Sequence, residues 1–155
     1  MKELEAPEIS GYTVFCDDLR FEVDGKITLV GSYHGVMLVR EAFPVTLPKF
    51  AMSVAFNQRK TVFEPKLRLK VFLPGDDKDE PSIVVEIEPP VDSPTFSSDR
   101  PNIGARANIV LAPLVLNSPG LIKVRIERRG ELHPVGTLTV VAAEVTSSTD
   151  PPPPS

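Results

Sequence analysis

The sequence is poor in the residues that build metal centres, disulfides and reactive thiol sites. Its 155 residues include one cysteine, Cys16, two histidines, His34 and His133, and no tryptophan. A single cysteine cannot form an internal disulfide or supply a cysteine-based zinc site. A catalytic cysteine would need a histidine beside it, and nothing in the sequence brings either histidine to Cys16. These shortages argue against an enzyme and against a metal or other cofactor.

Long apolar runs are missing too. No run approaches the ~18 apolar residues that a membrane-spanning helix needs, and the first ten residues lack the apolar region of a signal peptide. The 17 prolines make long helices improbable, because proline interrupts the helical hydrogen-bond ladder. We therefore predict a soluble, cytoplasmic protein.

The charge balance argues against two kinds of partner. The net charge is −4 and the pI about 5.2, whereas nucleic acids and anionic membranes attract clustered Lys and Arg. The length fits one domain, and 41% hydrophobic residues are enough for a core. We predict a single domain over residues 11–144, a flexible arm over 1–10 and a disordered proline-rich tail over 145–155.

Short segments of alternating apolar and polar residues fill the chain between Pro, Gly and Asp. This period of two is typical of strands with one wet face and predicts antiparallel sheets. We expect about nine strands, the clearest at 49–57, 66–73, 82–88, 121–128 and 135–143, with others at 12–16, 36–39 and 105–111. The predicted fold is an all-β, two-sheet sandwich of immunoglobulin-like or C2-like type, with a small closed β-barrel as the alternative. Residues 89–104 have no period and predict a long functional or flexible loop.

Two glycine-containing turns set the register of predicted hairpins. A three-residue loop, Val23-Asp24-Gly25, aligns apolar with apolar residues, including Leu19 with Leu29, and lets Glu22 pair with Lys26. The alternative makes Asp17 or Asp18 the cap of a helical turn, with the next strand starting at Lys26. The same three-residue loop at 128–130 would place Ile126 opposite Leu132.

Acidic residues gather in two places, Asp17-Asp18 and residues 76–80. Calcium prefers several carboxylates on loops, and sandwiches of the C2 type gather such loops at one end. Aspartate also favours turns for its own reasons, so we expect structural turns here and no metal site. Two carboxylates beside Cys16 would raise its pKa, which favours a small buried side chain over a reactive thiol.

Basic residues follow two predicted strands. Lys123, Arg125, Arg128 and Arg129 are placed on one outward strand and its turn, and residues 66, 68 and 70 on another outward face. No aromatic residues interleave with them, as a nucleic-acid platform would require. We interpret them as the solvated sides of sheets, where charge discourages edge pairing.

Several motifs resemble those of one family. The segments FCDDLR, GKITLVGSY, FPVTLPKF, FLPGDD and PGLIKVRIE are similar to a group of uncharacterised bacterial proteins that share a domain of unknown function. The resemblance spans about residues 15–141. It implies a bacterial, cytoplasmic setting and an all-β fold, and since no activity is assigned to the family, it implies no catalytic residue.

The sequence points most strongly to a non-enzymatic protein-interaction or structural module. The expected partner is another protein or a second copy of the chain, because sheets carry edge strands that must be covered. The alternative is a module that binds calcium or a small ligand at its acidic loops. No nucleic-acid or membrane partner is expected.

Overall fold

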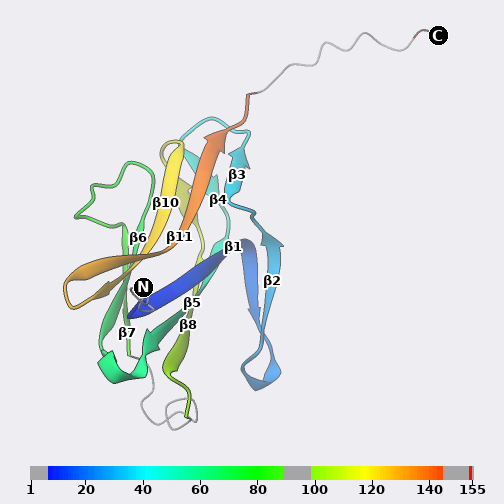
Figure 1. The fold of residues 1–155 in the computed structure, drawn as a ribbon. Coiled ribbons are helices and arrows are strands. Elements are labelled where there is room, and N and C mark those ends of the chain that lie inside the picture. Colours follow the sequence, from blue (N-terminus) through cyan, green and yellow to red (C-terminus); the bar gives the residue numbers. More distant parts are fainter. Residues whose placement is uncertain (1–6, 89–98, 145–153, 155) are drawn as a thin grey trace.

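Eleven strands form the described part of the chain, and the all-β prediction is confirmed (Figure 1). The computed structural model describes residues 7–88, 99–144 and 154. In those residues the only helical segments are two 3₁₀ turns, Val23–Gly25 and Lys60–Val62. The strands are β1 (Ile9–Phe21), β2 (Ile27–Ser32), β3 (Val36–Val39), β4 (Val45–Leu47), β5 (Phe50–Arg59), β6 (Leu67–Phe72), β7 (Ile83–Ile87), β8 (Asn102–Leu111), β9 (Leu114–Leu116), β10 (Gly120–Arg128) and β11 (Glu131–Ala142).

Within residues 7–88 and 99–144 the strands form three sheets, and none of these closes into the barrel that was the alternative prediction. A four-stranded sheet has the order β2-β1-β5-β8, and a five-stranded sheet has the order β3-β11-β10-β6-β7. All pairs are antiparallel except β3 with β11. The third sheet pairs β4 with β9, two short strands that the sequence did not predict. Each follows a cis X-Pro bond, at Pro44 and Pro113.

One core joins the two larger sheets. Phe50, Met52, Val54 and Phe56 of β5 are buried with the alternate residues of β6, β10 and β11. These are the apolar positions that the period of two had indicated, so the predicted inner faces of 49–57, 66–73 and 121–128 are confirmed. Alternate residues are buried because successive side chains of a strand point to opposite faces, so that one face lies in the core.

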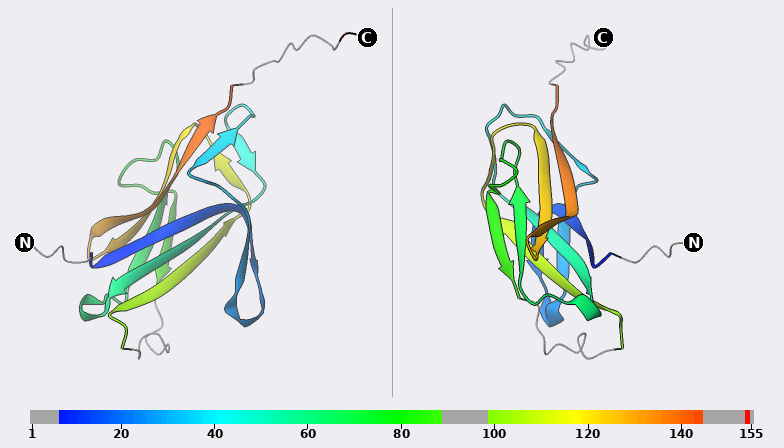
Figure 2. Two further views of the ribbon diagram at one scale, coloured as in Figure 1. Left: turned by 45° about the vertical axis from the view of Figure 1, so that its right-hand side comes forward. Right: turned by 60° about the vertical axis from the view of Figure 1, so that its left-hand side comes forward.

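Strand β1 links the parts of the fold. Its first half pairs with β5, and its second half pairs with β2. Figures 1 and 2 show β1 crossing the molecule and then turning sharply into a hairpin arm with β2. A second, small cluster forms where this arm folds back, from Cys16, Leu19 and Ala51 with Ile27 and Leu29 against them. The predicted strand 12–16 and the first strand of the hairpin are therefore parts of one long strand, β1.

The predicted register of the first hairpin is confirmed. Leu19 lies opposite Leu29, and Phe21 lies opposite Ile27. Asp24 and Gly25 both have positive φ, 63° and 70°, so two residues of the loop are left-handed, not glycine alone. The helical alternative at Asp17 or Asp18 is wrong, since both lie inside β1. Glu22 accepts a hydrogen bond from Thr28 instead of the predicted salt pair with Lys26.

The second predicted register is wrong by one residue. Ile126 lies opposite His133, and Arg128 lies opposite Glu131. The loop has only two residues, Arg129 and Gly130, both with positive φ (52° and 78°). Such turns match the right-handed twist of the flanking strands. A bulge between Val124 and Arg125 shifts the pairing further along.

The first strand starts before residue 11, where the predicted domain begins. β1 begins at Ile9, inside the arm predicted for residues 1–10, and Glu8 bonds to the body of the protein. The rest of that arm, most of the loop at 89–104 and nearly all of the tail at 145–155 lie outside the described residues. No helix in the described ranges is long and apolar enough to cross a membrane.

Candidate functional site

Asp17 holds the sharp turn in β1. Its Oδ1 accepts a hydrogen bond of 2.5 Å from the Tyr33 hydroxyl, and the Tyr33 amide donates to the Phe15 carbonyl. Gly31 lies opposite with φ 67°, and a Cβ there would stand 2.3 Å from the Asp17 Oδ2. Burial and the hydrogen bond to Asp17 raise the pKa of Tyr33, so this hydroxyl stays a donor. Asp17 is a structural residue of the bend.

Asp18 has a similar structural duty on the neighbouring position. Its Oδ1 accepts a 2.7 Å hydrogen bond from the Leu19 amide and lies 3.4 Å from the Lys49 ammonium. The hydrogen bond from the Leu19 amide, and after it the Lys49 ammonium, hold the pKa of Asp18 below its usual value. Neither aspartate is on a loop, which the calcium hypothesis required. The two adjacent aspartates are explained by their contacts at the bend in β1.

Cys16 is a core residue. Its side chain is fully buried, and its Sγ lies 3.6 Å from the Ala51 carbonyl oxygen. Burial first, and then the charges of Asp17 and Asp18, raise the pKa of the thiol. The structure agrees with the prediction of a small buried side chain rather than a nucleophile.

Asp76 organises the β6–β7 connection. Its carboxylate accepts hydrogen bonds from the amides of Leu73 and Ser82, at 2.8 and 2.9 Å, and from the Ser82 hydroxyl. This is the turn-forming role expected of an aspartate in a loop. In the described part of the chain, no group of three or more His, Cys, Asp or Glu side chains could hold a metal ion.

We expect the substitution Asp76→Asn to weaken the dependence of the free energy of unfolding on pH in the acid range. Burial opposes the charged carboxylate, but the bonds from Ser82 and Leu73 outweigh it and lower the pKa of Asp76 below its usual 3.8. A depressed folded-state pKa gives stability that is present above the unfolded pKa and is lost as the pH falls through the folded value. Urea unfolding at steps between neutral pH and about pH 2 measures this. An unchanged acid slope in the variant would contradict the assignment.

Arg128 is not on an outward face, and that prediction is corrected. Its side chain is only 3% exposed, because the two-residue turn rotates it inward. Its Nε donates to Gln58 Oε1 at 3.2 Å, its Nη1 to the Glu8 carboxylate and its Nη2 to the Val62 carbonyl. The guanidinium therefore ties the start of β1 and the end of β5 to the end of β10.

Gln58 completes this network. It is 1% exposed, and its amide group pairs in both directions with the Glu64 backbone, at 3.0 and 3.1 Å. The hydrogen bond from Arg128 lowers the pKa of Glu8. These contacts satisfy the buried polar groups of Arg128 and Gln58, as close packing requires. The Arg128 network is structural, and nothing in it presents a free reactive group.

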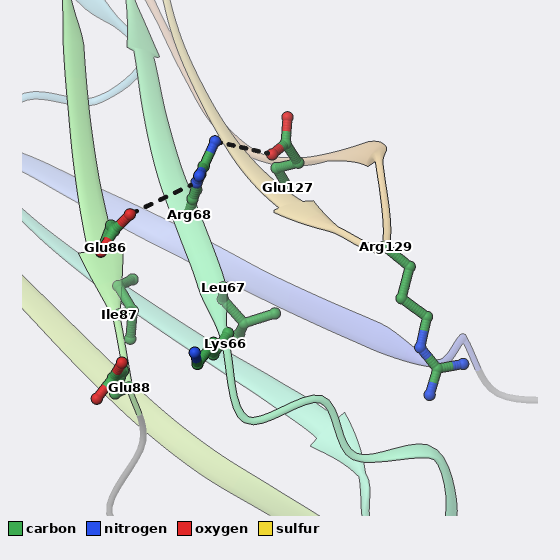
Figure 3. Close-up of a pocket in the computed structure, with 8 residues that line it drawn as sticks. All are labelled: Lys66, Leu67, Arg68, Glu86, Ile87, Glu88, Glu127 and Arg129. Atoms are coloured by element: carbon green, nitrogen blue, oxygen red, sulfur yellow. Dashed lines mark ion pairs between the residues drawn. The ribbon is translucent and has the colours of Figure 1, made fainter.

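One groove is lined by three cationic and three anionic side chains, so its charges balance (Figure 3). It has a volume of about 260 Å³ and is lined by Lys66, Leu67, Arg68, Glu86, Ile87, Glu88, Glu127 and Arg129. Arg68 lies between two carboxylates, 3.8 Å from Glu86 and 4.0 Å from Glu127. Lys70, on the same strand as Arg68, bonds to Glu127 at 2.5 Å. Two of the three basic side chains predicted to face outward at 66–70, Arg68 and Lys70, are thus paired with acids, which fits the interpretation of this face as a solvated sheet surface.

The edge strand β3 exposes apolar side chains to solvent. Its four residues, Val36, Met37, Leu38 and Val39, are all apolar, and Val36 and Leu38 are 47% and 59% exposed. Val141 lies opposite Leu38, and Leu121 lies one strand further on, opposite Thr139. We call Val36, Leu38, Leu121 and Val141 the β3 patch. Sequence reasoning found this strand but missed its place at the edge, because sheet order is not encoded locally.

Comparison with known proteins gives a family but no characterised relative. No curated protein and no solved structure matches the chain. The model of a family of unknown function matches residues 11–141, which confirms the expected membership of such a family. The chain belongs to DUF6941, a family of unknown function.

Proposed function

We propose that the chain is a non-enzymatic interaction module, built as an immunoglobulin-like or C2-like sandwich, that associates with a second copy of itself through β3. The observation that supports this is the composition of β3, which stands at the edge of the five-stranded sheet without a charged residue or proline. Edge strands of monomers are usually blunted by lysine, proline or a bulge. An apolar edge is typical of one that a further strand covers.

The backbone of β3 suits a two-fold pairing. The carbonyls of Gly35 and Val39 accept hydrogen bonds from Thr139 and Ala143, so these alternate residues face β11. By the alternation of strand backbones, the polar groups of Val36 and Leu38 then point to the open side. In an antiparallel pair centred on Met37, Val36 of one copy lies opposite Leu38 of the other. Each copy would offer the other the same two donors and two acceptors, which a two-fold interface demands.

The β3 patch is also complementary to itself. Its four side chains are aliphatic and partly exposed, so a second copy buries apolar surface against apolar surface with no unpaired charge. A partner with charged side chains at this position would lose their solvation on binding. The area involved is small, and weak, concentration-dependent association is expected.

We expect Leu38→Lys to abolish this association. The native chain should show an average mass in sedimentation that rises with concentration from 16.9 kDa towards twice that value. A lysine at position 38 brings like charges together in the dimer and leaves them poorly solvated. The matched control is Val23→Lys, at an 80% exposed valine of the β1–β2 turn, which should associate like the native chain. Equal behaviour of the two variants would contradict the proposal.

A further inference from the structure

A second surface on the same sheet has the chemistry of a ligand site. A cleft of about 380 Å³ lies on the outer face of β10, where the β6–β7 connection folds over the strand. Apolar side chains of Phe72, Pro74, Leu121 and Leu132 line it together with the cationic groups of Lys78, Lys123 and Arg125. Its volume is within the range of small-molecule sites.

The cleft holds an excess of positive charge that the protein does not neutralise. In the described ranges no ion pair joins Lys78, Lys123 or Arg125 to an acid. Asp76 supplies the carboxylate found among the described lining residues, and it accepts hydrogen bonds from Ser82 and Leu73. Arg125 also lies directly opposite Lys70 of β6, whose ammonium group is already paired with Glu127. That carboxylate is therefore not free to neutralise Arg125.

Arg125 is positioned to receive a carboxylate. Its Nη1 donates to the carbonyls of Val124 and Gly136, at 2.9 and 3.2 Å, across the bulge in β10. Those two bonds hold the guanidinium and leave its Nε and Nη2 edge without a described acceptor. This edge is the one that pairs with both oxygens of a carboxylate. The half-buried position of Arg125 would strengthen such a pair relative to one in open water.

We infer that this cleft binds a small organic acid, with its carboxylate on Arg125 and Lys123 and its aliphatic or aromatic body against Phe72, Leu121 and Leu132. The cations give the charge selection and the apolar floor gives the affinity. The acidic loop at 76–80, where the sequence predicted structural turns and offered calcium or small-ligand binding only as the alternative, contributes Asp76 and Lys78 to the lining of this cleft. The cleft shares Leu121 with the β3 patch, but its cationic groups lie outside that patch, so the inference does not rest on self-association through β3.

Titration of the ¹⁵N-labelled full chain with hexanoate, hexanol and acetate tests it. Hexanoate should bind with a dissociation constant of about 1 mM or tighter and shift the amides of residues 72–78 and 120–125. Hexanol lacks the charge and acetate lacks the apolar body, so each should bind at least about tenfold more weakly. Equal shifts from hexanol and hexanoate, or none that saturate at the cleft, would overturn the inference.

Two pairs of substitutions test whether the cationic groups of the cleft bind the carboxylate. Lys123→Gln with Arg125→Gln should weaken hexanoate binding about tenfold or more, whereas Lys66→Gln with Arg129→Gln removes two charges from the other groove and should leave it unchanged. If the first pair does not fold, Lys123→Gln alone serves, because that side chain is exposed. Unchanged hexanoate affinity in the variant that folds would also overturn the inference.

Discussion

Replacing Arg128 with methionine should lower the free energy of unfolding by about 3 kcal/mol. The change leaves the Val62 carbonyl and part of the Gln58 amide without their buried donor. Glu8, which is 44% exposed, can return to water, so its loss of a partner adds little. For a domain of this size the melting temperature should fall by roughly 6–12 °C. Thermal and urea unfolding measure both quantities.

Arg129→Met is the control beside it. Arg129 is 54% exposed, and among the described residues its ion pair is with Glu64, at 3.3 Å, so its removal should cost under about 1 kcal/mol. Arg128→Lys should fall between the two, because an ammonium keeps the charge but cannot donate in three fixed directions. If Arg128→Met and Arg129→Met destabilise equally, the Arg128 network does not join the strands as described.

Gly136→Ala should destabilise the protein, because a methyl group at position 136 has no free space. A Cβ at position 136 would stand 2.5 Å from the Thr13 Oγ1 and 2.6 Å from its Cβ, where β1 crosses β11. Thr13 is short and is fixed by its hydrogen bond to the Val135 carbonyl, at 3.0 Å, so one of the two strands must move. Overpacking of this kind costs about 1–3 kcal/mol. Urea unfolding of the variant gives the value.

Gly104→Ala provides the comparison. The nearest atom to a new Cβ there is Asn57 Oδ1, at 2.8 Å, the end of a side chain that can turn away. Its cost should be well below that of Gly136→Ala, and it can even be favourable, because alanine restricts the unfolded chain. Equal costs at the two positions would mean that β1 and β11 do not approach as closely as the structure places them.

Most features that depend on nearby residues in the chain could be predicted from the sequence. The register of Leu19 with Leu29 followed from matching apolar residues across one loop, and the buried face of β5 followed from a period of two. The turn after β10 was missed because Arg129 adopts a left-handed conformation, which is uncommon for a residue other than Gly, Asn or Asp. That one-residue error also reversed the position assigned to Arg128.

Long-range features could not be predicted in this way. Arg128 is buried because Glu8, Gln58 and Val62 reach it from elements that are distant in the sequence. Nothing in the apolar run at 36–39 distinguishes an edge strand from a central one. The roles of Asp17 and Asp18 became clear only once Gly31, Tyr33 and Lys49 were seen beside them.

The most direct test of self-association through β3 is amide hydrogen exchange of the full chain at low and high concentration. If a second copy pairs along this edge, the amides of Val36 and Leu38 should exchange more slowly at high concentration, while that of Val23 should not change. Leu38→Lys should lose the effect. Exchange of Val36 and Leu38 at the same rate at every concentration would contradict the proposal.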